Sequence, residues 1–244
     1  MAHRPIPFVH ERTSSTGKPV KNKILLAIPD NEFRALRPHL ESLDLADHIV
    51  LHEPHQPLEF VHFLNDGLVS LVVVLSDGKT VEAGIVGNEG VIGIPVLAGL
   101  PRSPLQEITQ ISGSGVRVPA GALREVLASA PQLHRKLELY AVVLGLQLAQ
   151  TAACNRLHGV EQRLARWLLM AQDRVDSPVL PITHDFLATM LGTDRPSVSL
   201  AAGLLQKNGL IEYNRGSVRI VNRDELRRVT CECYSVIQQY SSEL

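Results

Sequence analysis

The fold of the C-terminal part of the chain is decided by residues Pro181–Val221, PITHDFLATMLGTDRPSVSLAAGLLQKNGLIEYNRGSVRIV. Thr183 is a good N-cap for a short helix, and Gly192 stands where a tight turn between two helices needs a residue without a Cβ. Asp194 caps a second helix, with Pro196 in its first turn, where the missing N–H costs nothing. Apolar residues then recur at helical spacing and predict the buried side of this helix: Val198, Ala201, Ala202 and Leu205.

The opposite side of the second helix is polar at its N-terminal end. It carries Arg195, Ser197, Ser199 and Leu200. Gly209 suits the end of the helix, and two short strands follow, Leu210–Tyr213 and Ser217–Val221, joined at Asn214-Arg215-Gly216. Two amphipathic helices and a hairpin can also pack as a small α/β unit without a ligand. The order of caps, glycines and turn favours a winged helix whose second helix enters the major groove of DNA.

Length and composition bound the remaining possibilities. The 244 residues suffice for two domains, and 45% apolar with 20% charged residues is typical of a globular protein. The net charge of −1 means that DNA binding depends on a local basic patch. We expect no membrane-spanning run, because the longest apolar stretch, Tyr140–Ala153, is interrupted by Gln147, Gln150 and Thr151. Residues 1–23 lack the apolar stretch of a signal peptide, which predicts a cytoplasmic protein.

The first half of the chain has the pattern of closely spaced antiparallel strands. Turn residues separate runs rich in β-branched and aromatic residues: His48–His52, Leu58–Leu64, Val69–Leu75, Thr80–Val86, Gln106–Ile111 and Gly115–Val118. A helix is expected before them, over Asn31–Leu43. This pattern predicts a small barrel or a double-stranded roll.

Closely spaced glycines interrupt the strands at Gly87–Pro95. Such a loop can bring backbone N–H groups close to an anion, with Arg102 as a positive partner further along the chain. A simple crossover within the roll explains the same spacing equally well.

Two groups of residues contain possible metal ligands, and neither predicts a metal site. His48, His52, His55 and His62 lie near one another in sequence, but no acidic or Cys cluster completes a site. Cys231 and Cys233 lie in a segment expected to be one helix, Asp224–Tyr240, on which residues two apart point to different sides. Without a second pair of ligands nearby, we expect these two and Cys154 to be buried small side chains.

A long helix, Pro131 to about Leu157, is expected to connect the two parts. One apolar stripe runs along it and contains Leu137, Tyr140, Leu144, Leu148 and Thr151. Packing on the chain's own roll is the alternative, but we expect the stripe to contact a second copy of the chain. Asn155–His158 is a candidate hinge before a further helix, Val160–Arg174.

In this order of elements the chain resembles the Crp/Fnr family of bacterial transcription regulators, from about Ile24 to Tyr234. The resemblance is strongest in Gln162–Leu169 (QRLARWLL), from Leu187–Gly192 (LATMLG) through Asn208–Ile211 (NGLI), and in Arg215-Gly216. It implies an α+β fold with a cyclic-nucleotide-binding-type β-roll over 22–130, a dimerisation helix over 131–157 and a winged helix over 158–244. By position, it also implies that Arg195, Ser197, Ser199 and Leu200 contact bases or phosphates. To these DNA-binding residues we add Arg215, at the wing, for a phosphate, and Thr183.

The chain departs from the family pattern in both sites. Where cyclic-AMP-binding members have Gly-Glu-Leu-Gly and Arg-Ser/Thr-Ala, this chain has Gly90-Val91-Ile92-Gly93 and Arg102-Ser103-Pro104. Val91 cannot accept a hydrogen bond from the ribose, so cyclic AMP is disfavoured as the ligand of these residues. The N-terminal cysteines of iron–sulfur members are absent, and no particular histidine is marked as a haem ligand. In the second helix Pro196 and Leu200 replace the family's usual Glu and Arg, so its target sequence does not carry over.

These features favour a homodimeric, sequence-specific transcription regulator that binds a near-palindromic operator in double-stranded DNA. A small-molecule effector in the roll would gate it, and RNA polymerase would be a further partner. The alternatives are a nucleotide-sensing module that acts through protein contacts and a regulator that needs no effector. No spacing of nucleophile and base, paired carboxylates or metal ligands indicates an enzyme.

Overall fold

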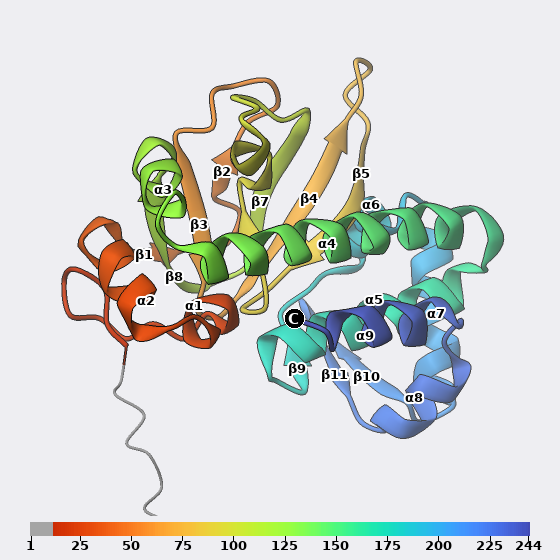
Figure 1. Ribbon diagram of the computed structural model, residues 1–244. Coiled ribbons are helices and arrows are strands. Elements are labelled where there is room, and N and C mark those ends of the chain that lie inside the picture. The colour runs from red at the N-terminus through yellow and green to blue at the C-terminus, as the bar shows by residue number, and fades with distance from the viewer. Residues whose placement is uncertain (1–11) are drawn as a thin grey trace, which may run out of the picture.

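The computed structural model describes residues 12–244 and has a β-roll, a long helix and a C-terminal winged helix (Figure 1). The expectation that the chain begins without a signal peptide falls partly on residues 1–11, outside the described range. The roll consists of two four-stranded antiparallel sheets, with strand orders β1-β8-β3-β6 and β2-β7-β4-β5. The predicted fold class is thus confirmed.

The strands of the roll place side chains in a shared apolar core, and β3 and β4 are buried along most of their length. Their bounds are β1 Glu41–Leu45, β2 Val50–His52, β3 Phe60–Leu64, β4 Leu68–Val74, β5 Thr80–Val86, β6 Val91–Ile92, β7 Leu105–Ile111 and β8 Gly113–Pro119. Short helices flank them: α1 Lys23–Ala27, α2 Asp30–Leu36, η1 Arg37–His39, η2 Ile94–Ala98 and α3 Ala120–Leu127.

The helix predicted over Asn31–Leu43 is too long. The α-helix ends at Leu36, a 3₁₀ turn follows, and β1 begins at Glu41. Pro38 accounts for the difference, because it has no N–H to donate to the carbonyl four residues earlier.

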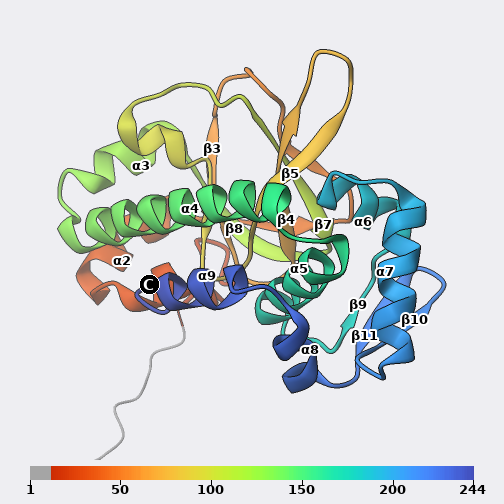
Figure 2. The ribbon, with the colours of Figure 1, turned by 90° about the vertical axis from the view of Figure 1, so that its right-hand side faces the viewer.

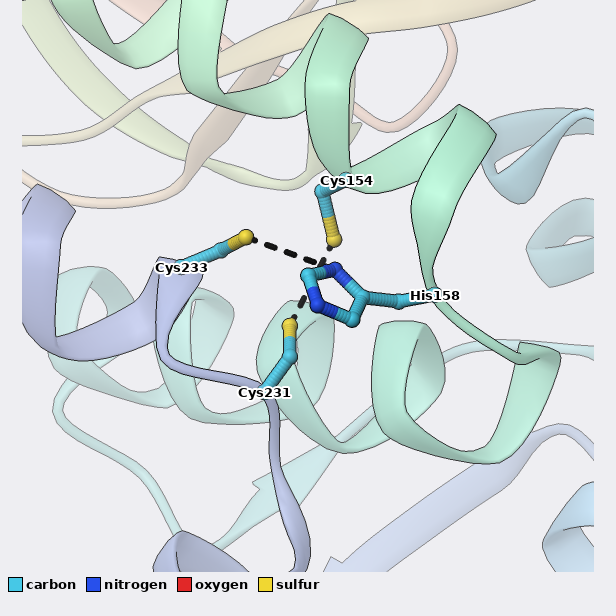
Figure 3. A group of neighbouring side chains, drawn as sticks. All are labelled: Cys154, His158, Cys231 and Cys233. Carbon is cyan, nitrogen blue, oxygen red and sulfur yellow. Dashed lines mark hydrogen bonds between the residues drawn. The ribbon is translucent and has the colours of Figure 1, made fainter.

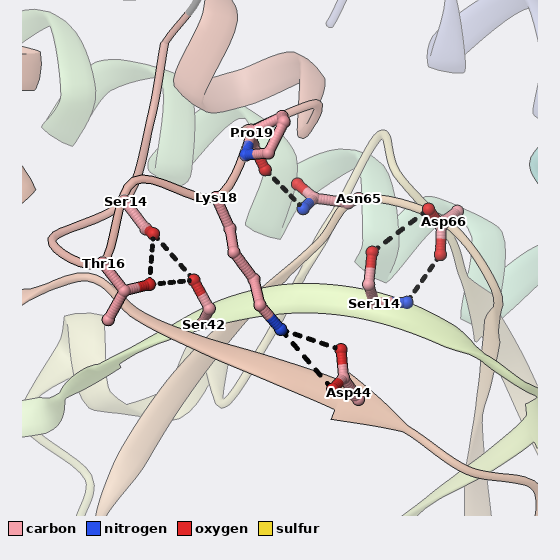
Figure 4. Close-up of polar contacts among 9 residues, drawn as sticks. All are labelled: Ser14, Thr16, Lys18, Pro19, Ser42, Asp44, Asn65, Asp66 and Ser114. Carbon is pink, nitrogen blue, oxygen red and sulfur yellow. Dashed lines mark hydrogen bonds and ion pairs between the residues drawn. The ribbon is translucent and has the colours of Figure 1, made fainter.

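The segment before α1 is fixed to the roll by polar contacts (Figure 4). Ser14 Oγ lies 2.7 Å from Ser42 Oγ, and Asn65 Nδ2 donates to the Pro19 carbonyl at 3.0 Å. An exposed ion pair joins Lys18 to the Asp44 carboxylate of β1. These contacts make the segment an outer layer on β1 and the loops beside it.

The long helix α4, Pro131–Leu157, lies along the roll and passes above α9 (Figures 1 and 2). Its buried side is Leu133, Leu137, Tyr140, Val143, Gln147, Thr151 and Cys154. By length and composition alone α4 could cross a membrane, so the expectation that no stretch reaches this length was wrong. Packing of one side on the roll gives a sufficient reason for its apolar character.

The stripe that we predicted for dimerisation lies on this buried side. Leu137 is fully buried and Tyr140 is 3% exposed, both within the core of their own roll. Leu144 and Leu148 are partly buried against the same core. These residues therefore pack on the chain's own roll, which was the alternative to a dimer contact. The periodicity of the helix identifies an apolar face, but it does not identify the surface that covers this face.

The C-terminal part is a winged helix built on α5. Its elements are α5 Val160–Val175, β9 Val179–Leu180, α6 His184–Leu191, α7 Arg195–Lys207, β10 Ile211–Asn214, β11 Ser217–Ile220, α8 Arg223–Val229 and α9 Cys233–Ser241. Three residues of the roll, Leu68, Ile85 and Ile111, belong to the same apolar cluster as this part. The roll and the winged helix therefore share a packed contact.

The single helix predicted over Asp224–Tyr240 is divided into α8 and α9. The chain leaves the helix at Thr230, whose backbone is extended, and resumes at Cys233. The argument that Cys231 and Cys233 point to different sides of one helix therefore does not apply.

Candidate nucleic-acid interface and effector region

The helix-turn-helix forms as the sequence predicts. Thr183 Oγ1 accepts the Phe186 N–H at 3.2 Å and caps α6, and Asp194 Oδ1 accepts the Ser197 N–H at 2.8 Å and caps α7. Gly192 between the helices has φ 58°, in the left-handed region that favours glycine. These contacts fix the angle at which α7 leaves the turn.

The N-terminal end of α7 presents exposed side chains. Arg195 is 65% exposed, and its Nε lies 3.4 Å from Asp185 Oδ1 in a surface ion pair. Leu200 is 69% exposed, so an apolar group stands on the surface that would face the bases. Ser197 Oγ donates to Asp194 Oδ2 at 2.8 Å, which commits this hydroxyl to the helix cap.

A cluster that sequence reasoning missed supports this end of the helix. His184 Nδ1 lies 3.0 Å from Ser199 Oγ, and the His184 ring stacks on Tyr213 with 3.8 Å between centroids. Burial, and then the charge of Arg195, lower the pKa of His184. Ser199 is therefore held by a histidine from α6, and no spacing in the sequence indicates this pairing, which forms only when the two helices pack.

The wing places Arg215 at the tip of the β10–β11 hairpin. The turn contains Gly216 with φ 78°, and the Arg215 side chain is exposed. Arg219, on the next strand, lies 3.8 Å from Glu212 in an exposed ion pair. Arg215, unlike Arg219, has no ion-pair partner within the described residues, which leaves its charge available for a phosphate.

The glycine loop, a candidate anion cradle in the sequence, is packed against helices. A Cβ on Gly90 would clash with the Tyr140 ring, and one on Gly87 would clash with the Arg174 side chain. The Gly90 N–H already donates to the Gly87 carbonyl at 3.1 Å. The glycines therefore let α4 and α5 pack closely against the loop. This favours the interpretation of the loop as a crossover within the roll over that of an anion-binding loop.

The predicted ligand residues are only partly brought together. Val91, Ile92, Gly93 and Ser103 line a cavity of about 200 Å³ between the roll and α4. Arg102 is not among the lining residues, and its Nη1 donates to the His55 carbonyl on the surface at 3.2 Å. A guanidinium for a cyclic phosphate is thus missing from this cavity.

The cavity carries a buried carboxyl group in place of a cation. Glu107 is 4% exposed and lines the cavity beside apolar side chains from α4, among them Leu144 and Leu148. Burial raises the pKa of Glu107, while His52 lowers it. Among the described residues that line the cavity none is basic, which agrees with the departure from the cyclic-AMP pattern.

Buried polar contacts connect the glycine loop and the roll to α5. Arg174 Nε lies 2.8 Å from Glu89 Oε1, and these side chains are only 5% and 15% exposed. Arg174 Nη2 also donates to Gln147 Oε1 of α4 at 2.8 Å. Trp167 Nε1 donates to Glu82 Oε1 of β5 at 2.7 Å. A movement of the loop would therefore change the contacts of α5, the helix on which the winged helix is built.

The cysteines are not isolated. Cys154, His158, Cys231 and Cys233 form a group whose donor atoms all lie within 4.8 Å of one another. Our premise that no second pair of ligands lies near Cys231 and Cys233 was wrong, because the end of α4 supplies that pair. The histidines at positions 48, 52, 55 and 62 form no such group within residues 12–244.

Comparison with known proteins agrees with this architecture. Residues 162–229 match the family described as "Crp-like helix-turn-helix domain". FixK2 from Bradyrhizobium japonicum has a TM-score of 0.68 at 19% identity, over 79% of this chain and 98% of its own. CLP, a c-di-GMP responsive global regulator of Xanthomonas campestris, has a TM-score of 0.66 at 15% identity, over 79% of this chain and 99% of its own. TTHB099, a CRP-family transcriptional regulator of Thermus thermophilus, has a TM-score of 0.62 at 21% identity, over 77% of this chain and 95% of its own. The search of curated protein sequences gave no match.

At these identities the solved structures establish the fold, which is a β-roll joined by a long helix to a winged helix. The Crp-like helix-turn-helix domain contains Pro181–Val221, the stretch from which the sequence predicts a winged helix. Residues 162–229 are thus a Crp-like helix-turn-helix domain, in a chain that has the fold of these solved structures.

Proposed function

We propose that the chain is a sequence-specific DNA-binding transcription regulator that acts as a homodimer in the cytoplasm. The observation that carries the proposal is the exposed N-terminal end of α7, held by the Thr183 and Asp194 caps and backed by a buried apolar side. In a helix-turn-helix this end of the second helix contacts the base edges, while the neighbouring helix and the wing contact phosphates. The domain bounds remain 22–130, 131–157 and 158–244.

The proposed contacts follow from exposure and chemistry. Arg195 is the candidate for a bidentate bond to guanine, and Leu200 for apolar contact with a thymine methyl group. Ser199 is exposed and is oriented by His184. Ser197 and Thr183 contribute through the caps that they form, and Arg215 contacts a phosphate from the wing.

The dimer surface that we propose is the exposed side of α4, in place of the buried stripe. Val142 is 61% exposed and Leu146 is 42% exposed. Ala149 and Ala153 are exposed and continue the row at spacings of three and four. This row has the period of a helix pair that packs through small and apolar residues. Two copies joined along it would present two α7 helices to adjacent major grooves, about 34 Å apart.

The effector, if one is used, fits the cavity between the roll and α4. Its volume of about 200 Å³ lies below the roughly 300–1,000 Å³ of typical small-molecule sites. Its apolar lining and Glu107 favour a small, uncharged or cationic compound over cyclic AMP. A regulator without an effector remains the second candidate, favoured by the close packing of Tyr140 against Gly90.

Selection of bound sequences from a random pool of duplex DNA tests the proposal. The full chain is used at one fixed salt concentration, with and without cyclic AMP, since salt alone changes such affinities strongly. A palindrome enriched equally under both conditions supports a dimeric DNA-binding protein that does not need cyclic AMP. Enrichment only with cyclic AMP contradicts the assignment of the cavity. No enrichment, with the protein folded and dimeric, favours a module that acts through protein contacts.

A further inference from the structure

Three cysteines and one histidine meet where the end of α4 faces the start of α9 (Figure 3). Cys154 and His158 come from the last turn and the C-cap of α4, and Cys231 and Cys233 come from the α8–α9 link and the first residue of α9. The three cysteines are at most 3% exposed and form a separate cluster in the interior. Figure 3 shows the four side chains pointing toward one common centre.

Two of the distances between donor atoms are close to those of a tetrahedral metal site, and all of the donor atoms lie within 4.8 Å of one another. Cys154 Sγ and Cys231 Sγ are 3.5 Å apart, and Cys233 Sγ lies 3.5 Å from His158 Nδ1. Zinc bonds of about 2.3 Å to sulfur and about 2.0 Å to nitrogen require separations of about 3.8 Å between sulfurs and about 3.5 Å between sulfur and nitrogen. A disulfide requires about 2.05 Å, so the sulfurs are spaced for a shared ion rather than for a bond.

Neighbouring groups orient the ligands as they do around bound metals. The other ring nitrogen of His158, Nε2, lies 3.3 Å from Glu232 Oε2, which fixes Nδ1 toward the sulfur atoms. A carboxylate on the far nitrogen of a histidine is the usual outer partner of a metal-binding imidazole. Gln150 Nε2 donates to Cys233 Sγ at 3.1 Å, a bond that stabilises a thiolate.

The surrounding charge also suits an anionic centre. Arg163 and Arg166 are buried, at 7% and 3% exposure, and in each the Nε–H has no partner in the part of the chain that the structure describes. Both guanidinium groups act electrostatically on Cys154. Three thiolates, one neutral imidazole and a divalent cation carry a net charge of −1, which the arginines would offset.

We propose that Cys154, His158, Cys231 and Cys233 form a tetrahedral site for a divalent cation of the zinc class. Three thiolates select a soft or borderline metal, and four protein ligands leave no open position, which makes the site structural. Binding forms three metal–sulfur bonds and one metal–nitrogen bond, and it releases to solvent the protons of those thiols that are protonated.

Such a site would stabilise the candidate hinge, Asn155–His158, in one conformation. Cys154 and Cys231 are separated by 77 residues, and the site joins the end of α4 to the segment that closes the winged helix. The ion would hold α9 on α4 and fix the direction in which α5 leaves His158. The proposal does not depend on the proposed function, because it is tested by metal content and cobalt spectra rather than by DNA binding.

Metal analysis of the full chain tests the proposal. The protein is purified under reducing conditions with added zinc and then dialysed, and metal and free thiols are counted per chain. We expect one zinc per chain in the wild type and none in Cys154→Ser or His158→Ala. His134→Ala is the matched control, because His134 lies on the same helix, 45% exposed and in a surface pair with Glu138. It should keep the full complement of zinc.

Cobalt gives a second readout that does not depend on the folding of a variant. Wild-type protein loaded with Co²⁺ should show thiolate-to-cobalt charge transfer and the intense visible bands of a tetrahedral complex. Glu232→Gln should retain these bands with metal affinity weakened roughly 10–100-fold, as is usual for an outer partner. Wild-type protein with three free thiols and no bound metal would overturn the proposal. A Cys154–Cys231 disulfide formed in preference to metal binding would overturn it too.

Discussion

Glu82 is the residue whose ionisation should most clearly change the stability of the molecule. It lies on β5, fully buried, and accepts hydrogen bonds from Trp167 Nε1 and Ser70 Oγ. Burial raises its pKa from 4.5 to about 7, although these bonds and the charges of Arg166 and Arg174 oppose the shift. Since the folded pKa exceeds the unfolded one, the stabilisation by this group is complete below pH 4.5 and is lost as the pH rises through 7.

The magnitude follows from the two pKa values. Each unit of difference corresponds to about 1.4 kcal/mol, so the wild type should lose about 2 kcal/mol of unfolding free energy by pH 6 and about 3 kcal/mol by pH 8 through this group. Glu82→Gln removes the titration and keeps an oxygen for the Trp167 N–H. The variant should therefore gain stability relative to the wild type across this window.

Urea unfolding of both proteins at several pH values between 5 and 8 measures the difference directly. Glu212→Gln, an exposed change on the wing, should follow the wild type at every pH. Trp167 is the only tryptophan of the chain, so its emission should report the same ionisation with a midpoint near 7. A difference between Glu82→Gln and wild type that does not vary with pH would refute the reasoning.

The remaining predictions concern DNA binding, dimerisation and the glycine loop. Arg195→Ala should cost roughly 1–3 kcal/mol of DNA-binding free energy and relax the preference at one base pair, whereas Arg215→Ala should weaken binding to all sequences alike. Competition binding measures both effects. An equal loss of binding on every sequence for Arg195→Ala would contradict its contact with a base. Leu146→Glu should convert the dimer to monomers in ultracentrifugation without changing the fold, and an unchanged dimer would exclude the exposed side of α4. Gly90→Ala should cost about 1–3 kcal/mol of stability in urea, because its Cβ meets the Tyr140 ring, and a neutral effect would mean that the ring has room to move.

What the sequence predicts correctly here are features set by neighbouring residues. The caps at Thr183 and Asp194 and the turn at Gly192 depend on backbone groups a few residues away, so their type and position suffice. The fold class followed from the same local patterns, and it is confirmed by the two sheets and by the Crp-like helix-turn-helix domain.

What the sequence did not predict depends on contacts between distant segments. The period of α4 marked Leu137 and Tyr140 as apolar but not which surface would bury them. Thr230–Glu232 breaks a segment whose composition is helical throughout, and this break turns Cys231 and Cys233 toward α4. The cluster of three cysteines and His158 joins Cys154 to Cys231, which are 77 positions apart in the sequence, and no local spacing reveals such a pairing.

The structure gives α5 contacts with both the roll and the helices of the winged helix. It begins next to His158, contacts Glu82 of β5 through Trp167, and contacts Glu89 of the glycine loop through Arg174. Its apolar side packs in one cluster with α7, so α5 and α7 should move as a unit. A compound in the cavity that displaces the loop would act on the Glu89–Arg174 pair first. Because breaking a buried pair leaves a costly unpaired charge, such a displacement should destabilise the present position of α5 and, with it, of α7.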